Sequence, residues 1–238
     1  MEREFPPPRR AGLQGSALVG LLAHLQLAPA SRPGAPPAFV EGLGRWLGWK
    51  EAIPLSAVLQ PVPGPAAGAS APAAQAQRQA VALAREFQRV EQALRQAITQ
   101  DSSTAREDGQ DFQPFRRRCF SLQQAMEAAI SPLRTQLRTA VSRLSPALAQ
   151  LAALDAVMAT TLAPREQAQL AQMPVLLEKH FMRLRQTAAA HPTPAPWLDQ
   201  FRQDMQQLML AELDLRLQPV QGLLATLQQA HPAPEKTP

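Results

Sequence analysis

A long run of apolar residues at steps of three and four most restricts how this chain folds. Helix-forming residues dominate positions 112–186, and the central apolar positions are Ile130, Leu133, Leu137, Val141, Leu144, Leu148, Leu151, Leu154 and Met158. Such steps keep side chains on one face of an α-helix, because a turn takes about 3.6 residues. A strand would alternate by two, which this run does not do. The run predicts either an amphipathic helix packed in a bundle or a helix of an exposed coiled coil.

Composition favours an all-α protein. Ala, Leu and Gln dominate the 238 residues, Tyr is absent and Gly numbers only 11, so few residues favour strands. We expect a short N-terminal helical module, a linker, and an elongated antiparallel helical bundle or coiled-coil body. The expected ranges are 1–14 for a disordered basic, Pro-rich lead, 15–60 for the module, 61–75 for a Pro/Ala/Gly linker, 76–230 for the body and 231–238 for a disordered tail.

Three prolines share a local pattern, in which an apolar residue, a polar residue and Pro precede a Leu five positions later. The segments are 130–137, 144–151 and 217–224. Ser before Pro suits an N-cap and the first helical position, whereas Pro inside a helix costs about 3 kcal/mol and bends it. Each Pro therefore predicts a helix start or a bend. We also expect a turn with a helix restart at 161–166, and a bend or a late start at Pro174.

The N-terminal module carries several of the largest side chains, and its candidate anchors are Phe39, Leu43, Trp46 and Trp49. Trp pairs cage cations in some proteins, but they more often anchor a core. With about 45 residues, the module needs contact with the body or with another chain to be stable. Its first part imitates a signal peptide, but His24 and Gln26 interrupt the apolar run, so we expect no cleavage.

Arginines give the first part of the predicted long helix a strong positive charge. Between residues 115 and 143, Glu127 is opposed by six arginines: Arg116, Arg117, Arg118, Arg134, Arg138 and Arg143. Phosphate binding is one interpretation, which makes nucleic acid a candidate partner. No Tyr or Trp is interleaved for base stacking, so a solvated face or a face for an acidic protein partner is preferred.

The residue types of catalytic and metal sites do not combine into a motif. Glycine-rich phosphate loops and G-x-S-x-G are absent, and the four His lack ligand spacing, so we expect no cofactor, metal or enzyme activity. Cys119 follows three arginines, which favour a reactive thiol, but a plain buried Cys is commoner. Asp155 is expected to be half buried with a structural hydrogen bond, and His180 has no evident partner. A cleft gathering Asp155, His180 and Arg185 would indicate an enzyme.

Five groups of residues form a recognisable set: GSALV with LLA at 15–23, FVEGLGRWLGW with AI and LS at 39–56, Gln124 with Met126 and Glu127, LAALD at 151–155 with Met158, and AELDLRLQP at 211–219. This set resembles a bacterial family of uncharacterised proteins, domain of unknown function 3348. The resemblance implies a soluble bacterial protein but no activity, so no catalytic residues carry over. Similar families tend to lie beside genes for envelope proteins, which suggests a role accessory to an envelope complex.

The expected function is therefore a non-enzymatic adaptor or scaffold that binds a protein partner, or its own copies, through helical seams. A single Cys fits a reducing compartment, so we expect a cytoplasmic location. No apolar run approaches the roughly 20 residues that span a bilayer, so no transmembrane segment is expected.

Overall fold

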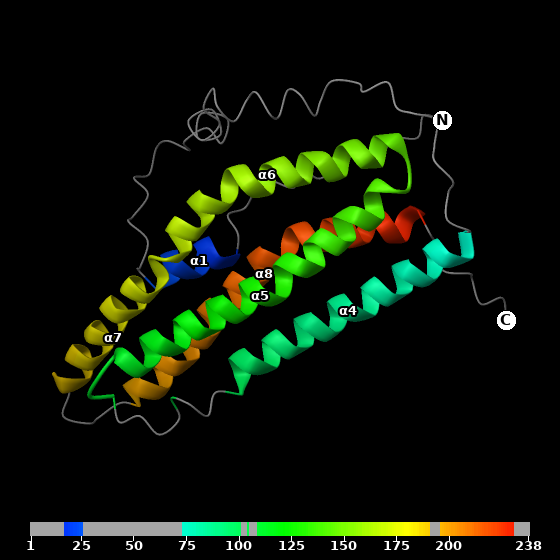
Figure 1. The fold of residues 1–238 in the computed structure, drawn as a ribbon. Helices are drawn as coiled ribbons and strands as arrows, with labels where there is room; N and C mark the ends of the chain where they lie inside the picture. The colour runs from blue at the N-terminus through cyan, green and yellow to red at the C-terminus, as the bar shows by residue number, and fades with distance from the viewer. Residues whose placement is uncertain (1–16, 26–72, 101–103, 105–108, 191–195, 231–238) are drawn as a thin grey trace, which may run out of the picture.

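The structure, a computed structural model, describes residues 17–25, 73–100, 104, 109–190 and 196–230. These residues form helices and no strand, which confirms the all-α prediction. The helices are α1 (Ala17–His24), α4 (Ala73–Thr99), α5 (Gln113–Ser142), α6 (Pro146–Leu170), α7 (Met173–Ala189) and α8 (Trp197–Ala230), as Figure 1 shows.

The two helices α5 and α8 form the centre of the fold. α5 contacts α4, α6, α7 and α8, while α8 also contacts α1, α4 and α7 (Figure 1). The predicted stripe of α4 faces this centre, since Ala80, Leu83, Phe87 and Leu94 are buried. The predicted period-3.6 pattern therefore corresponds to real packing faces, each of which buries apolar surface against a neighbouring helix.

An aromatic cluster joins α5, α7 and α8 at one end of the bundle. The rings of Phe115 and Phe181 each lie 5.1 Å from the ring of Phe201, and Trp197 lies 5.2 Å from Phe181. Phe112 closes the cluster at 5.5 Å from Phe181. Such edge-to-face and tilted pairs are favourable beyond their area burial, so this cluster fixes the three helices firmly at their meeting point.

The described part of the N-terminal module packs on the body. Leu18 and Leu25 of α1 are buried in the same core as the long helices, and α1 contacts α8. Arg183 of α7 donates a hydrogen bond to the carbonyl oxygen of Leu25 at 2.7 Å. The lead, the linker as far as residue 72, the tail and the candidate anchors Phe39, Leu43, Trp46 and Trp49 lie outside the described residues.

The prolines behave in two ways. Ser145 has extended backbone angles and its Oγ accepts a hydrogen bond from the backbone N–H of Leu148 at 3.2 Å, so Pro146 starts α6. Pro174 likewise lies in the first turn of α7, which confirms a late start. Pro132 and Pro219 instead lie inside α5 and α8.

The restart expected at 161–166 is wrong, because α6 continues through Pro164. A proline whose missing N–H lies on a solvent-exposed side of a helix disturbs no packing, and Pro164 is exposed. Leu162, Ala163 and Glu166 beside it are good helix formers, which favours helix on both sides of the proline.

We predict that Ser145→Ala lowers the free energy of unfolding by about 1 kcal/mol, because it removes the N-cap of α6. Ser131 supplies a matched control, since it also precedes a proline but is exposed inside α5. Ser131→Ala should leave stability unchanged or raise it by up to about 0.5 kcal/mol, since Ala is the better helix former. Urea unfolding of both variants measures the difference, and equal losses would contradict the assignment of the cap.

We predict that Gly109→Ala destabilises the fold by more than about 1 kcal/mol. Gly109 has φ of 78°, and a Cβ there would lie 2.8 Å and 2.9 Å from ring atoms of Trp197. Gly222 supplies the opposite case, because nothing lies within 4 Å of a Cβ added to it inside α8. Gly222→Ala should stabilise by about 0.5–1 kcal/mol, and thermal unfolding that ranks the two variants in the reverse order would refute this explanation.

Candidate functional site

The six candidate arginines do not form one open basic surface. Arg134 and Arg138 of α5 both pair with Asp155 of α6, at 2.6 Å and 2.9 Å. Arg116 pairs with Glu178 of α7, and Arg118 donates to the carbonyl oxygen of Ala97 on α4. Arg117 and Arg143 are exposed, so these two remain most accessible to an outside partner.

A buried carboxylate links α5 to α8. Glu212 is 0% exposed, and its oxygens accept hydrogen bonds from Nε2 of Gln123 at 3.1 Å and 3.2 Å and from Nε of Arg216 at 3.0 Å. Arg216 also reaches Glu127 of α5 at 3.2 Å. Burial raises the pKa of Glu212, although Arg216 and Gln123 act in the opposite direction.

A second buried polar group joins α7 to α8. Nε2 of His180 lies 2.7 Å from Oδ2 of Asp204, and the other carboxylate oxygen of Asp204 accepts from Gln200 at 2.8 Å. Nδ1 of His180 lies 2.8 Å from NH2 of Arg183. Since a guanidinium only donates, Nδ1 accepts and the imidazole proton lies on Nε2, facing Asp204. His180, whose partner was not evident from the sequence, is therefore a packed residue held by Asp204 and Arg183.

The buried carboxylates of Asp204 and Glu212 were not identified from the sequence, although their positions in it carry a signal. Asp204 stands three residues after Phe201 and four before Leu208, and Glu212 stands four after Leu208, so both carboxylates fall on the apolar stripe of α8. A charged residue on such a stripe must find partners, because an isolated buried charge is very costly. Asp155 was recognised in this way, and its half-buried structural role is confirmed by its two ion pairs.

The contacts of His180, Asp155 and Arg185 do not bring these three side chains together as a catalytic group. Both ring nitrogens of His180 are engaged by Asp204 and Arg183, which leaves neither free to take a proton from a substrate. Asp155 pairs with arginines of α5, and Arg185 donates to the carbonyl oxygen of Gln110 at 3.1 Å. The structure thus distributes Asp155, His180 and Arg185 among separate contacts rather than in one cleft.

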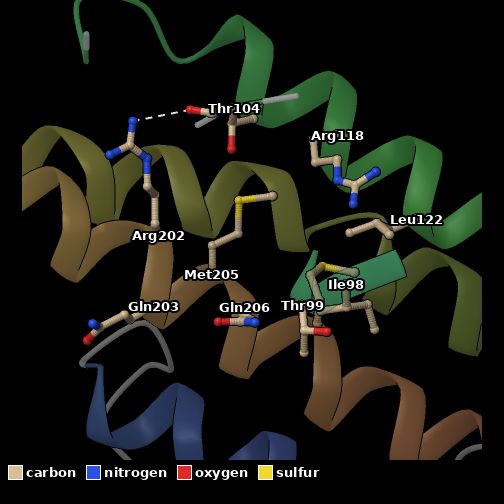
Figure 2. Close-up of a pocket in the computed structure, with 10 residues that line it drawn as sticks. Ile98, Thr99, Thr104, Arg118, Leu122, Arg202, Gln203, Met205 and Gln206 are labelled. Atoms are coloured by element: carbon tan, nitrogen blue, oxygen red, sulfur yellow. Dashed lines mark hydrogen bonds between the residues drawn. The ribbon is translucent and has the colours of Figure 1, made fainter. Parts of the chain in front are cut away.

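A cavity of about 260 Å³ lies among the end of α4, α5 and α8 (Figure 2). Apolar side chains from three helices line part of it, including Ile98, Leu122 and Met205, and the guanidinium groups of Arg118 and Arg202 lie at its edge. Arg202 donates to the carbonyl oxygen of Thr104 at 3.1 Å. Arginine is the only titratable residue type among the described lining residues, and because it does not deprotonate in proteins, these residues offer no general base.

Cys119 is a buried structural residue. Its side chain is fully enclosed, its Sγ lies 3.6 Å from Sδ of Met209, and burial raises the pKa of the thiol to about 12. The three preceding arginines therefore do not activate it. Within the described ranges, no group of three His, Cys, Asp or Glu side chains lies close enough together to hold a metal ion.

One feature left over by this packing is an apolar stripe on α6, and Phe120 of α5 and Val175 and Met182 of α7 are also exposed. Leu151, Leu154, Met158 and Leu162 are spaced three, four and four residues apart, so they share one side of the helix, and we call them the α6 stripe. Leu151 is 41% exposed and the other three are partly buried, and none is among the residues that pack on the core. The first half of the same predicted seam, from Ile130 to Val141, is buried in α5.

The face of α6 that packs on the body differs from the face that carries the α6 stripe. α6 packs against α5, and it contributes Ala152, Leu148 and Leu170 to the core and the ion pairs of Asp155 to the contact. Within Pro146–Ala189, one 18-residue window is long and apolar enough to cross a bilayer by length and composition, and little of that window is buried. Core helices of soluble proteins and signal sequences meet the same criterion of length and composition, so this stretch by itself assigns no membrane location.

We predict opposite pH dependences for variants of Asp155 and Glu212. Burial raises the pKa of Asp155, but Arg134 and Arg138 outweigh it and hold the pKa below its ordinary 3.8. Its ionised form therefore contributes stability above that pH, which is lost as pH falls through the lowered pKa. Asp155→Asn should cost stability at neutral pH, and its difference from the parent protein should vanish in acid.

The raised pKa of Glu212 has the opposite effect, because the native state holds this proton more tightly than the unfolded chain does. Stability contributed by Glu212 is lost as pH rises from 4.5 through the raised pKa. Glu212→Gln should therefore gain stability relative to the parent protein as pH rises over that window. Urea unfolding from about pH 3 to about pH 8 measures the difference in unfolding free energy between each variant and the parent protein. If the two differences changed with pH in the same direction, the environments assigned to Asp155 and Glu212 would be contradicted.

Comparison with known proteins places the chain in a family. No curated protein and no solved structure matches it. The family model described as Protein of unknown function (DUF3348) matches residues 6–229, which include every helix of the structure except the last residue of α8. The match confirms the resemblance found in the sequence, and its length leaves little of the chain outside it. The chain therefore belongs to the DUF3348 family.

Proposed function

We propose that this chain is a non-enzymatic assembly protein that binds a helical partner along the α6 stripe. The observation that carries the proposal is that α6 holds four large apolar side chains which do not pack on the core. Burying a fully exposed Leu is worth about 1.5–3 kcal/mol, so a partner helix gains a part of that value at each position and the largest part at Leu151, the most exposed of the four.

The charge around the stripe indicates what kind of partner fits. Asp155, the charged residue nearest its centre, is already neutralised by Arg134 and Arg138. A partner that brought a charge to the stripe would bury it without a counter-ion, which is costly. An amphipathic helix presenting its own apolar seam, as in coiled-coil and helix-in-groove recognition, is the chemistry that fits. A cytoplasmic location and a role accessory to an envelope complex remain further parts of this proposal.

Nucleic-acid binding through the arginines is the alternative from another class. Four of the six candidate guanidiniums already have carboxylate or carbonyl partners within the fold, and a phosphate would have to displace them. Since phosphate contacts supply most non-specific affinity, two exposed arginines offer little for it. These contacts favour the helical partner.

We predict that Leu151→Glu reduces partner capture at least tenfold, because a lost Leu contact of about 1.4 kcal/mol already corresponds to tenfold. Val81→Glu is the matched control, since Val81 of α4 is also 41% exposed and lies in another helix. Quantitative affinity capture from native host cells, together with sedimentation velocity of the purified chain, would measure partners and self-association. Capture that is equal for both variants, or a monomer that retains no partner, would overturn the proposal.

A further inference from the structure

A second exposed surface lies where α5 and α7 run side by side in opposite directions (Figure 1). Arg116 of α5 pairs with Glu178 of α7. About two turns further along α5, Gln123 donates to the carbonyl oxygen of Leu170, just before α7 begins, at 3.1 Å. These two contacts define how the helices are aligned, because a higher residue number on α5 lies opposite a lower one on α7.

Phe120 and Val175 come together between those two contacts. Phe120 is four residues after Arg116, so it shares the side of α5 on which the ion pair lies. Val175 is three residues before Glu178 and shares the corresponding side of α7. At about 1.5 Å per residue, the two lie about 6 Å and about 4.5 Å beyond the ion pair in the same direction. Their exposed fractions are 46% and 42%, so two neighbouring apolar side chains face solvent.

Three more exposed side chains belong to the same face. Met182 is 42% exposed and lies seven residues after Val175, about two turns along the same side of α7. Lys179 is exposed between them, at helical spacing from both. Arg117 of α5 is exposed three residues before Phe120. Three apolar and two cationic side chains thus share one face, which we call the α5–α7 surface.

We propose that the α5–α7 surface binds an acidic amphipathic helix of another protein. Because Arg116 and Glu178 neutralise each other, Arg117 and Lys179 leave the surface positive. A partner helix that runs beside α7 meets Val175 and Met182 with apolar residues of its own one heptad apart. Carboxylates next to those apolar residues reach the two cations, which gives the contact its specificity. The surface shares no residue with the α6 stripe, so this inference adds a second docking site to the proposed function and does not depend on it.

The position of the charges favours a protein partner over a lipid surface. Lys179 lies between Val175 and Met182, and the partly exposed ion pair of Arg116 and Glu178 lies among the same side chains. Insertion of the apolar side chains into a bilayer would carry these charges toward hydrocarbon, which is costly. A helix places apolar and acidic side chains on adjacent positions, so it can satisfy both kinds of residue at once.

The same charges disfavour a second copy of the chain and nucleic acid. In a two-fold contact both copies present the same patch, so two positively charged surfaces would face each other. Non-specific affinity for nucleic acid grows with the number of phosphates that are neutralised, and Arg117 and Lys179 neutralise few. An acidic helix is the occupant that complements the cations and also covers the apolar side chains.

Fluorescence anisotropy with a defined peptide tests the inference on the full chain. The probe is a labelled synthetic helix of about 20 residues, about 30 Å long, with Leu at heptad positions a and d and Glu at e and g. We expect micromolar binding of this Glu peptide and at least tenfold weaker binding of the same peptide with Lys in place of Glu. Phe120→Ala should weaken binding of the Glu peptide at least tenfold, because Phe120 is the most exposed apolar residue of the surface.

Charge reversal identifies the site on the protein. Arg117→Glu with Lys179→Glu should reverse the preference, so that the Lys peptide binds more tightly than the Glu peptide. Arg85→Glu with Arg143→Glu is the matched control, because it changes the net charge equally at exposed positions of α4 and at the end of α5. The control should keep the preference for the Glu peptide. Far-UV circular dichroism establishes that each variant retains its helices.

Four outcomes would refute the inference. The first is absence of Glu-peptide binding, and the second is a preference that the control pair reverses as strongly as Arg117→Glu with Lys179→Glu. The third is binding of phosphatidylglycerol vesicles, lost in Phe120→Ala, by a chain that ignores the peptide, which would identify a lipid surface. The fourth is a dimer in sedimentation velocity that Phe120→Ala dissociates, which would identify a second copy as the occupant.

The two docking surfaces are distinguished by their variants. Peptide binding that is lost in Leu151→Glu but kept in Phe120→Ala would place the peptide on the α6 stripe, which refutes this inference and supports the proposed function. Peptide binding that is lost in Phe120→Ala, in a chain whose partner capture is unchanged by Leu151→Glu, would support the α5–α7 surface and refute the proposed function.

Discussion

Apolar contact between α5 and α8 is the interaction on which the rest of this structure depends. Both helices bury long stripes, and α1, α4, α6 and α7 each attach to one or both of them. The stripes are strong enough to keep Pro132 and Pro219 inside their helices, although each proline removes a backbone hydrogen bond. Leu133 and Val220, which follow these prolines, are both buried, so packing holds each helix together across its break.

Buried polar groups give this contact its register. Apolar stripes favour packing of two helices, but a slide by one turn, about 5.4 Å, would still leave Leu facing Leu. Such a slide would separate Glu212 from Gln123 and leave a buried carboxylate with fewer partners, which is strongly unfavourable. The pair of His180 and Asp204 has the same effect between α7 and α8. This role accounts for ionisable side chains in the core without any catalytic purpose.

Spacing in the sequence was enough to predict the buried faces of α4, α5 and α8, because side-chain periodicity reflects the geometry of a helix directly, but it did not predict which face of α6 packs on the core. It could not distinguish Pro146, which starts a helix, from Pro164, which lies inside one, since the difference depends on Ser145 capping the backbone of Leu148. Nor could it pair His180 with Asp204 or Arg134 with Asp155, because these contacts depend on how separate helices are aligned. The sequence also suggested a basic face between residues 115 and 143, because the carboxylates that pair with its arginines, Asp155 and Glu178, lie on other helices.

The predicted seam changes its role at Ser145, and this change makes α6 the candidate surface. Before Ser145 the seam is buried between helices, whereas after the chain reverses, Leu148 still packs against the core but Leu151, Leu154 and Met158 do not. A helix that only completed a bundle would direct its largest side chains at its neighbour. Of the leucines of α6, Leu148 and Leu170 pack in the core beside Ala152, and Asp155 with its two arginines completes the attachment. Because this attachment does not require Leu151, Leu154, Met158 or Leu162, these side chains are available for a different apolar surface.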